Sequence, residues 1–276
     1  MFIAGIVLVL IGLGLVFWSK KKKQGAAVMA TTETSRVGDM LSLVQSVRDE
    51  MPGGGSSGYA EVAELKGTVA CDAPLTGELS GQTAAICDSR VVRVVESRHE
   101  VRDSQGSVRT EWRKTEEVVS QNRREAVFYL DDGSGRVRVL TNGAKLELEK
   151  VVDRFEPPTG AEQGLGDKLT VGYGAFRVAV GAMAMATGGH RRTVGYRFEE
   201  RILPVGRALY ALGELADLDD GLVLRQPEKK GSPYLLSLKS EAELLASASK
   251  AARWLAVGGI ALAVLGGVLA VIGLVR

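Results

Sequence analysis

The two ends of the chain are apolar, and a long polar segment with short alternating stretches lies between them. Residues 2–18 and residues 254–275 carry no charged side chain and are almost wholly hydrophobic. A helix rises about 1.5 Å per residue and the hydrocarbon core of a bilayer is about 30 Å thick. The second segment therefore predicts a full membrane span, and the first predicts a short one. Trp18 and Trp254 stand where these spans meet the polar segment, a position that interfacial indoles prefer.

The charges beside the two spans predict their orientation. Basic residues gather on the side of the polar segment: Lys20, Lys21, Lys22, Lys23, Lys250 and Arg253. Because a cleaved signal peptide carries its positive charge before the apolar run, the lysines after residues 2–18 favour an uncleaved anchor. The positive-inside rule then places the middle of the chain in the cytoplasm and both termini outside. We expect an integral membrane protein whose basic residues and interfacial tryptophans contact the surface of the lipid bilayer.

Cys71 and Cys87 fit this orientation. A reducing compartment would keep both residues as free thiols. A Cys71–Cys87 disulfide is the alternative if the orientation is reversed.

Glycines recur at intervals of seven residues in both spans. They are Gly5 and Gly12 in the first span, and Gly259, Gly266 and Gly273 in the second. This spacing keeps them on one helix face, where small residues let two backbones approach closely in lipid. The spans are expected to pack on each other or on a second copy, as in a homo-oligomer or a subunit of a membrane complex. The alternative is that glycine is simply common in membrane helices.

The polar segment begins with one amphipathic helix and continues with strands. Residues 35–51 place apolar side chains at helical spacing, with Ser35 as a plausible N-cap, and the Gly/Ser stretch 52–58 follows as a linker. Alternating segments rich in β-branched residues come next, separated by turn sequences such as "DDGSG" at 131–135. The apolar stretch 173–189 is expected to be a buried helix or a membrane-proximal insertion. Ser240 and Glu243 form a capping box that opens a further helix.

The predicted fold class is therefore α+β and β-rich, with a compact antiparallel barrel-like β domain flanked by two transmembrane helices. The predicted domain limits follow the chain in order: 1–19 for the first membrane helix, 20–58 for the basic stop, juxtamembrane helix and linker, 59–239 for the β domain, 240–253 for a second juxtamembrane helix, and 254–275 for the second membrane helix.

No constellation of residues predicts catalysis. The loop with Asp131 and Asp132 lacks the later oxygen ligands of a calcium loop and continues into arginines, so it is expected to be a hairpin turn. His99 and His190 both lie beside arginines and are expected on the surface. The chain offers no phosphate loop, no dinucleotide fingerprint and no C-x-x-C pair, so neither a cofactor nor a metal site is predicted. Nucleic acid is not an expected partner, because the net charge is only +2.

The order of several motifs resembles a known family. They are "ELKGTVACDAPLTGELSGQTAAICDSRVV", "FYLDDGSGRVRVLTNGAKLEL", "GYRFEERILPVGRALYALGEL" and "SPYLLSLKSEAEL", the last one shortly before the second span. Together with the two-span layout, this succession resembles the GIDE family, whose membrane-flanked region is also called the BAM (beside a membrane) domain. The resemblance implies a relation to mitochondrial E3 ubiquitin ligases, which add a RING finger after the second span.

This chain departs from that pattern, and the departure shapes the expected function. A RING finger holds two zinc ions with eight Cys and His ligands, whereas this chain has two residues of each kind. A RING-less, prokaryotic-type member is therefore expected, acting as a non-catalytic binding, sensing or scaffold module held against the bilayer and serving an unknown protein partner. The alternative is ubiquitin ligase-related or other unrecognised enzyme activity, completed by a partner chain.

Overall fold

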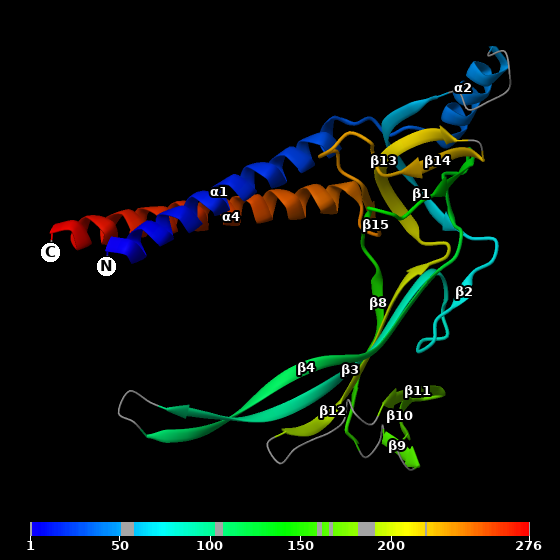
Figure 1. The fold of residues 1–276 in the computed structure, drawn as a ribbon. Helices are drawn as coiled ribbons and strands as arrows, with labels where there is room; N and C mark the ends of the chain where they lie inside the picture. The colour runs from blue at the N-terminus through cyan, green and yellow to red at the C-terminus, as the bar shows by residue number, and fades with distance from the viewer. Residues whose placement is uncertain are drawn as a thin grey trace. The chain divides into compact units, whose positions relative to one another are not determined.

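The computed structural model describes residues 2–50, 58–102, 107–158, 162–165, 168–181, 191–218 and 220–275. It is an α+β structure rich in strands, with a closed five-stranded barrel and two long apolar terminal helices (Figure 1). The chain divides into two compact units. Unit 1 comprises Met1–Gly67, Leu130–Leu146 and Ala208–Arg276, and unit 2 comprises Thr68–Tyr129 and Glu147–Arg207. The range 59–239, predicted as one β domain, is thus shared between both units.

The barrel belongs to unit 1 and draws its strands from distant parts of the sequence. Its order is β1 (Ala60–Ala70), β5 (Tyr129–Asp131), β6 (Arg136–Val139), β14 (Gly221–Arg225) and β13 (Ala208–Leu218). The ring closes because β13 also pairs with β1. Two short strands, β15 (Leu235–Ser237) and β7 (Lys145–Leu146), extend the sheet from β13. Closure removes the exposed edges that an open sheet would present.

The sequence predicted an antiparallel barrel, and the observed barrel contains both antiparallel and parallel pairs. β14 pairs with β13 antiparallel, but β6 pairs with β14 in parallel and β7 pairs with β15 in parallel. The interior is filled by fully buried aliphatic side chains: Leu65, Leu130, Val137, Leu215 and Leu224. Leu215 and Leu224 stand directly opposite each other on β13 and β14 and so share one face of the sheet, and burial of these side chains favours closure of the ring.

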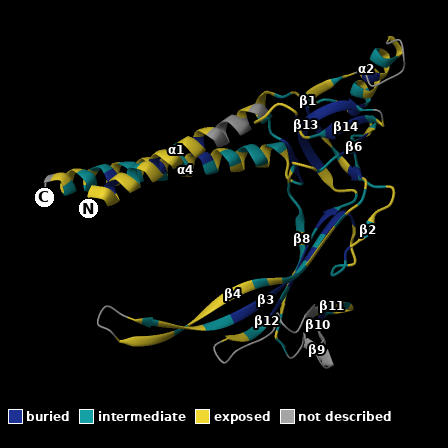
Figure 2. Ribbon diagram, in the orientation of Figure 1, coloured by how far each residue is buried: buried dark blue, intermediate teal, exposed yellow. Residues whose placement is uncertain are grey.

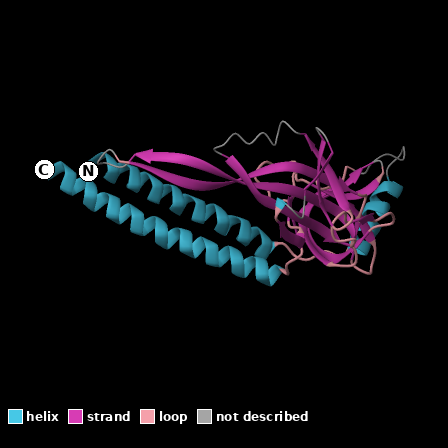
Figure 3. Ribbon diagram, turned by 90° about the horizontal axis from the view of Figure 1, so that it is seen from below, coloured by secondary structure: helices cyan, strands magenta, loops and turns pink. Residues whose placement is uncertain are grey.

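Helices α1 (Phe2–Thr31) and α4 (Glu241–Val275) lie side by side in antiparallel orientation, with both termini at the same end (Figures 1 and 3). Phe2–Lys20 and Glu241–Leu274 are long and apolar enough to cross a membrane, and most of their side chains are not buried inside the protein. Both helices continue past the apolar runs. α4 begins at Glu241, and the helix that the capping box was predicted to open runs without a break into the second span.

Helix α2 (Val37–Glu50) confirms the amphipathic helix predicted for residues 35–51 and buries Val37 and Val44. The predicted N-cap, Ser35, is wrong: α2 begins at Val37, and the N–H groups of Val37 and Gly38 donate to Asp132 Oδ2 (2.8 Å) and Ser134 Oγ (2.9 Å). The cap comes from the turn between β5 and β6, which is described below.

Unit 2 is built on an antiparallel sheet with long strands. The path runs β2 (Leu75–Thr76), β3 (Thr83–Arg102), β12 (Arg191–Pro204) and β8 (Glu149–Glu156), and β4 (Val108–Glu125) also pairs with β3. Residues of β3 and β12 are largely buried, whereas β4 is mostly exposed (Figure 2).

A small three-stranded sheet packs on this one. It consists of β9 (Glu162–Leu165), β10 (Lys168–Tyr173) and β11 (Phe176–Gly181). Val171 joins Tyr196 and Phe198 in one buried cluster, and Tyr173 and Phe176 pack against it. The buried helix predicted for 173–189 is therefore wrong over its first part, which forms β11 after a turn. Residues 182–190 lie outside the described residues.

Cys71 and Cys87 are both free thiols in the structure. Cys87 is buried beside Ala84 and Ile202. Burial raises the pKa of its thiol above the ordinary value.

Candidate functional site

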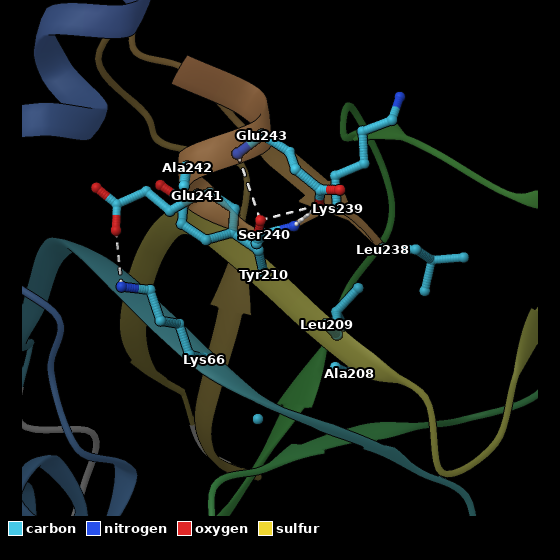
Figure 4. Close-up of a pocket in the computed structure, with 11 residues that line it drawn as sticks. Lys66, Ala208, Leu209, Tyr210, Leu238, Lys239, Ser240, Glu241, Ala242 and Glu243 are labelled. Carbon is cyan, nitrogen blue, oxygen red and sulfur yellow. Dashed lines mark hydrogen bonds and ion pairs between the residues drawn. The ribbon is translucent and has the colours of Figure 1, made fainter. Parts of the chain in front are cut away.

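A pocket of about 480 Å³ lies in unit 1 between β1, β13 and the start of α4 (Figure 4). Its volume is within the range of small-molecule sites. Its apolar lining includes Ala208, Leu209, Leu238 and Ala242. Its polar lining comes from Lys66, Tyr210, Lys239, Ser240, Glu241 and Glu243.

The capping box predicted from the sequence forms one wall of the pocket. Glu243 Oε2 accepts hydrogen bonds from the backbone N–H and the hydroxyl of Ser240, both at 2.9 Å. The Glu243 N–H donates to Ser240 Oγ at 3.3 Å. These reciprocal bonds satisfy two N–H groups that the first turn of a helix otherwise leaves unpaired, and they fix where α4 begins.

A glycine shapes the opposite wall. A Cβ atom added to Gly67 would lie 2.5 Å from the Asp131 carbonyl oxygen, which is shorter than any ordinary contact. Gly67 therefore lets β1 approach β5 closely. Its neighbour Lys66 is half-exposed and extends toward α4 (Figure 4).

Behind the pocket lies a buried carboxylate, Glu64. Its Oε2 accepts a hydrogen bond from the Tyr210 hydroxyl at 2.7 Å, and its Oε1 accepts one from the Thr34 hydroxyl at 2.7 Å. The Lys66 ammonium lies 2.9 Å from Oε1. Glu64 is thus a buried charge with both oxygens satisfied, which is the condition under which proteins tolerate such a group.

The protonation of this network follows from its contacts. Burial by itself raises the pKa of the Glu64 carboxyl, but the donors Thr34, Lys66 and Tyr210 outweigh it and hold that pKa below its ordinary value. Burial and the Glu64 carboxylate raise the pKa of Tyr210. At neutral pH Glu64 is therefore ionised and Tyr210 keeps its proton. The network therefore holds a buried negative charge between β1 and β13.

Lys66 connects the barrel to the membrane-directed helix. Its ammonium donates to Glu241 Oε2 at 2.8 Å and to Thr34 Oγ1 at 2.9 Å, in addition to its contact with Glu64. The hydrogen bond to Glu241, followed by that to Glu64, raises the pKa of Lys66. Glu241 is the first residue of α4. A ligand in the pocket would touch both sides of this link, with apolar walls beside it and the cations Lys66 and Lys239 at its rim.

The residues predicted for the membrane surface all lie on the two long helices. Lys20, Lys250 and Arg253 are exposed, and so are Trp18 and Trp254. The side chains of Lys21, Lys22 and Lys23 are outside the described part of the structure.

The predicted packing glycines lie mainly where α1 meets α4. Gly5, Gly12, Gly259 and Gly266 are buried. A Cβ atom at Gly12 would lie 2.5 Å from the Gly259 carbonyl oxygen, and one at Gly5 would lie 2.6 Å from that of Gly266. Gly273 is half-buried near the end of α4.

The residues weighed as catalytic candidates do not form a site among the described residues. Asp131 and Asp132 belong to the hairpin turn between β5 and β6. His99 lies on β3 opposite Glu111, and His190 falls outside the described residues. No cluster of three or more His, Cys, Asp or Glu side chains suited to a metal ion occurs in the described part of the chain.

A second buried carboxylate, Glu200, stabilises a loop in unit 2. It accepts hydrogen bonds from the backbone N–H groups of Leu79 (2.9 Å) and Ser80 (2.8 Å) and from the Ser89 hydroxyl (2.8 Å). A Cβ atom on Gly77 would lie 2.6 Å from Glu200 Oε2, so the loop requires glycine there. This carboxylate has all its neighbours within the fold and serves as a structural anchor.

Sequence reasoning missed Glu64, Lys66 and Tyr210 as a group. Glu64 and Lys66 occur in "AELKG", where charged residues in an alternating strand indicate a solvated face. Tyr210 comes from a strand far along the chain. Only the closure of β13 onto β1 brings the three together.

A comparison with family models covers three of the four sequence motifs, and the first motif, at residues 64–92, lies before the matched range. A family model named GIDE and described as "E3 Ubiquitin ligase" matches residues 96–271. Comparisons with curated proteins and with solved structures gave no match.

Proposed function

Because the chain belongs to the GIDE family and has two helices suited to crossing a membrane, we propose that it is a membrane-anchored, non-catalytic binding module. Its ligand site is the pocket between the barrel and α4. The observation that carries this proposal is the position of the pocket at the joint where the barrel meets the helix that leads to the membrane.

The ligand class follows from the lining. The lining combines the aliphatic side chains of Leu209 and Leu238 with two lysines, Lys66 and Lys239, and two glutamates, Glu241 and Glu243. An apolar group would bury its surface against Leu209 and Leu238, and a negative charge on it would have to take the place of Glu241 beside Lys66. Binding would also compete with Glu241 for Lys66, so occupancy would change the link between barrel and helix. That competition makes the module a sensor as well as a binder.

The helices set the distance between this site and the bilayer. Residues 241–253 of α4 precede the apolar run and, at about 1.5 Å each, rise about 20 Å. The site would therefore stand off the bilayer on a helical stalk, with Lys20, Lys250 and Arg253 at the base of the stalk near the lipid head groups. Each such charge contributes on the order of 1 kcal/mol of attraction to an anionic surface.

Site-directed photo-crosslinking tests the binding proposal on the full-length chain in its native membrane. A benzophenone amino acid replaces Leu238 in the pocket, and a control variant carries it at exposed Phe155 of unit 2. We expect a discrete adduct by intact mass spectrometry at position 238 that disappears when Ala242→Trp fills the pocket. No adduct at 238, or the same adducts at both positions, would refute the pocket as a binding site.

The family description favours a second candidate, ubiquitin transfer. Residues 1–276 contain two Cys and two His, fewer than the eight zinc ligands of a RING, so a RING-type activity would need zinc ligands beyond these residues. The test is the discharge of ubiquitin from a charged conjugating enzyme, with the full-length protein in nanodiscs and empty nanodiscs as control. Equal rates support the non-catalytic proposal, and a faster rate with the protein supports the ligase.

A further inference from the structure

Strand β4 in unit 2 has one edge that no other described strand covers. Among the strands that the structure describes, β4 pairs with β3 alone. Residues 112–116 are exposed in succession, which means that both faces of the strand as well as its outer edge are open to solvent there (Figure 2). Such an edge offers unpaired backbone donors and acceptors to another strand.

The charges along this edge are positive before Thr115 and negative after it. Arg113 and Lys114 precede Thr115, and Glu116 and Glu117 follow it. In an antiparallel pairing of two copies centred on Thr115, Arg113 of one copy faces Glu117 of the other, and Lys114 faces Glu116. We propose that β4 pairs antiparallel with β4 of a second copy of this chain, about a two-fold axis at Thr115, and joins the two sheets into one.

The residues beside the charges support the same register. Trp112 of one copy would face Val118 of the other, and these two side chains are 49% and 56% exposed. Even-numbered residues from 108 to 118 share one face of β4, because they stand opposite even-numbered residues of β3. The pairing therefore covers an exposed indole with an exposed aliphatic side chain on the same side of the sheet, a favourable cross-strand combination.

Neighbouring registers lose this match. Centring the pairing on residue 114 places Glu111 opposite Glu117, and Trp112 opposite Glu116. Centring it on residue 116 places Lys114 opposite Val118 and leaves Arg113 opposite Val119. Like charges directly opposite each other are destabilising, so the charge pattern selects the register centred on Thr115.

The charges on this edge also explain why the partner is another copy and not an arbitrary strand. Charged residues on an edge strand normally prevent foreign pairing. Here they are complementary to their own reversed order. Lys114 already lies 3.6 Å from Glu96, and Glu116 lies 3.3 Å from Arg197, within one sheet. With 66% and 55% of these side chains still exposed, both can make a second ion pair across the edge.

Cysteine cross-linking in the full-length chain tests the register. In a background with Cys71→Ser and Cys87→Ala, Thr115→Cys places two thiols directly opposite each other. Paired antiparallel residues have Cα atoms about 4.5–5.5 Å apart, within the reach of a disulfide. Arg113→Cys is the matched control: residue 113 of one copy stands four positions from residue 113 of the other, about 13 Å away.

The expected result is a disulfide-linked dimer for Thr115→Cys after mild oxidation in the membrane, and none for Arg113→Cys. Failure of Thr115→Cys to cross-link, or equal yields from both variants, would overturn the proposal.

A charge exchange provides a second test that does not depend on cysteines. Lys114→Glu places two like-charge pairs in each dimer and is expected to weaken dimerisation by roughly tenfold in sedimentation or mass photometry. The double variant Lys114→Glu/Glu116→Lys keeps the mirrored order and is expected to recover the wild-type dimer. Equal dimerisation of wild type and the single variant would contradict the proposal. This interface does not involve the pocket of unit 1, so its failure would leave the proposed function untouched.

Discussion

Asp132 joins segments of unit 1 that are far apart in the sequence. Its Oδ2 accepts a hydrogen bond from the Val37 N–H at 2.8 Å, and its Oδ1 accepts one from the Ser134 N–H at 2.9 Å. The hydroxyl of Ser134 in turn accepts the Gly38 N–H at 2.9 Å. The turn between β5 and β6 therefore caps helix α2.

The sequence predicted the turn between β5 and β6 correctly, because its glycines and carboxylates are local signals. The cap could not be predicted, because its donor and acceptor are about a hundred residues apart.

The first prediction concerns this cap. Asp132→Ala removes the carboxylate that accepts hydrogen bonds from the N–H groups of Val37 and Ser134. Helix α2 should therefore lose about 1–2 kcal/mol of local stability. Hydrogen exchange of the α2 amides in the full-length protein should accelerate by about tenfold. Asp131→Ala is the control, since the Asp131 carboxylate accepts the Gly133 N–H within the turn and does not cap α2. Unchanged exchange in the Asp132 variant would contradict this role.

Glu200 leads to a prediction about pH. Burial alone raises the pKa of this carboxyl, but its hydrogen bonds with Ser80, Leu79 and Ser89 outweigh burial and hold that pKa below its ordinary value. Since the folded-state pKa is depressed, the unfolded state binds more protons in the window below about pH 4.5. The stabilisation is therefore fully present above that pH and is lost as the pH falls through the folded-state pKa.

Glu200→Gln tests this sign. At neutral pH the variant should lose roughly 2–3 kcal/mol, because an amide cannot accept all three hydrogen bonds. Below pH 4.5 the stability difference between variant and wild type should shrink. Unfolding can be followed by the fluorescence of Trp112 after Trp18→Phe and Trp254→Phe, which leaves one indole in the chain. A stability difference that stays constant from pH 7 to pH 3 would refute the assignment.

At the scale of elements, the sequence was most informative where a pattern is local and long. Both apolar helices, α2 and the capping box at Ser240 follow from periodicity and spacing. For the described residues 173–181, the expectation of a buried helix was wrong, because small and apolar residues without strict alternation favour a helix. Phe176 and Val178 instead pack on the cluster around Phe198, so tertiary packing decided for strands.

The contact between α1 and α4 gives the third prediction. A Cβ atom at Gly266 would lie 2.6 Å from the Gly5 carbonyl oxygen, and backbone cannot move aside as a side chain can. Gly266→Ile should therefore separate the two helices and lower the stability of the pair by about 1–3 kcal/mol. Titration of mixed micelles with SDS should show an earlier unfolding transition.

Gly267→Ile is the matched control, because nothing lies within 4 Å of a Cβ atom there. It should behave as the wild type. Since the close approach of Gly266 occurs within one chain, neither variant should change the oligomeric size. A loss of oligomers with Gly266→Ile alone would instead favour packing of the spans on a second copy.

At the scale of the whole molecule, the sequence indicated the fold class, the two apolar helices and the family, but not the organisation of the strands. The sequence order of the predicted strands suggested one β domain at residues 59–239. In the structure, each of the two units contains strands from separate parts of the chain. The barrel closes only when β13 meets β1, and that pairing joins residues more than a hundred positions apart. Alternating polarity identifies strands and their buried faces, but it carries no information about which strand is the neighbour. The pocket depends on that closure and was missed for the same reason.

The last prediction concerns the orientation of the membrane spans. The basic residues beside the apolar runs lie on the side of the two folded units, and the positive-inside rule places that side in the cytoplasm. Exposed Lys230 becomes the single cysteine in a chain with Cys71→Ser and Cys87→Ala. A membrane-impermeant thiol reagent should then fail to label intact cells and should label after lysis. Labelling of intact cells would reverse the orientation. The ligand of the pocket would then have to be sought outside the cell, and the free thiols Cys71 and Cys87 would face an oxidising environment.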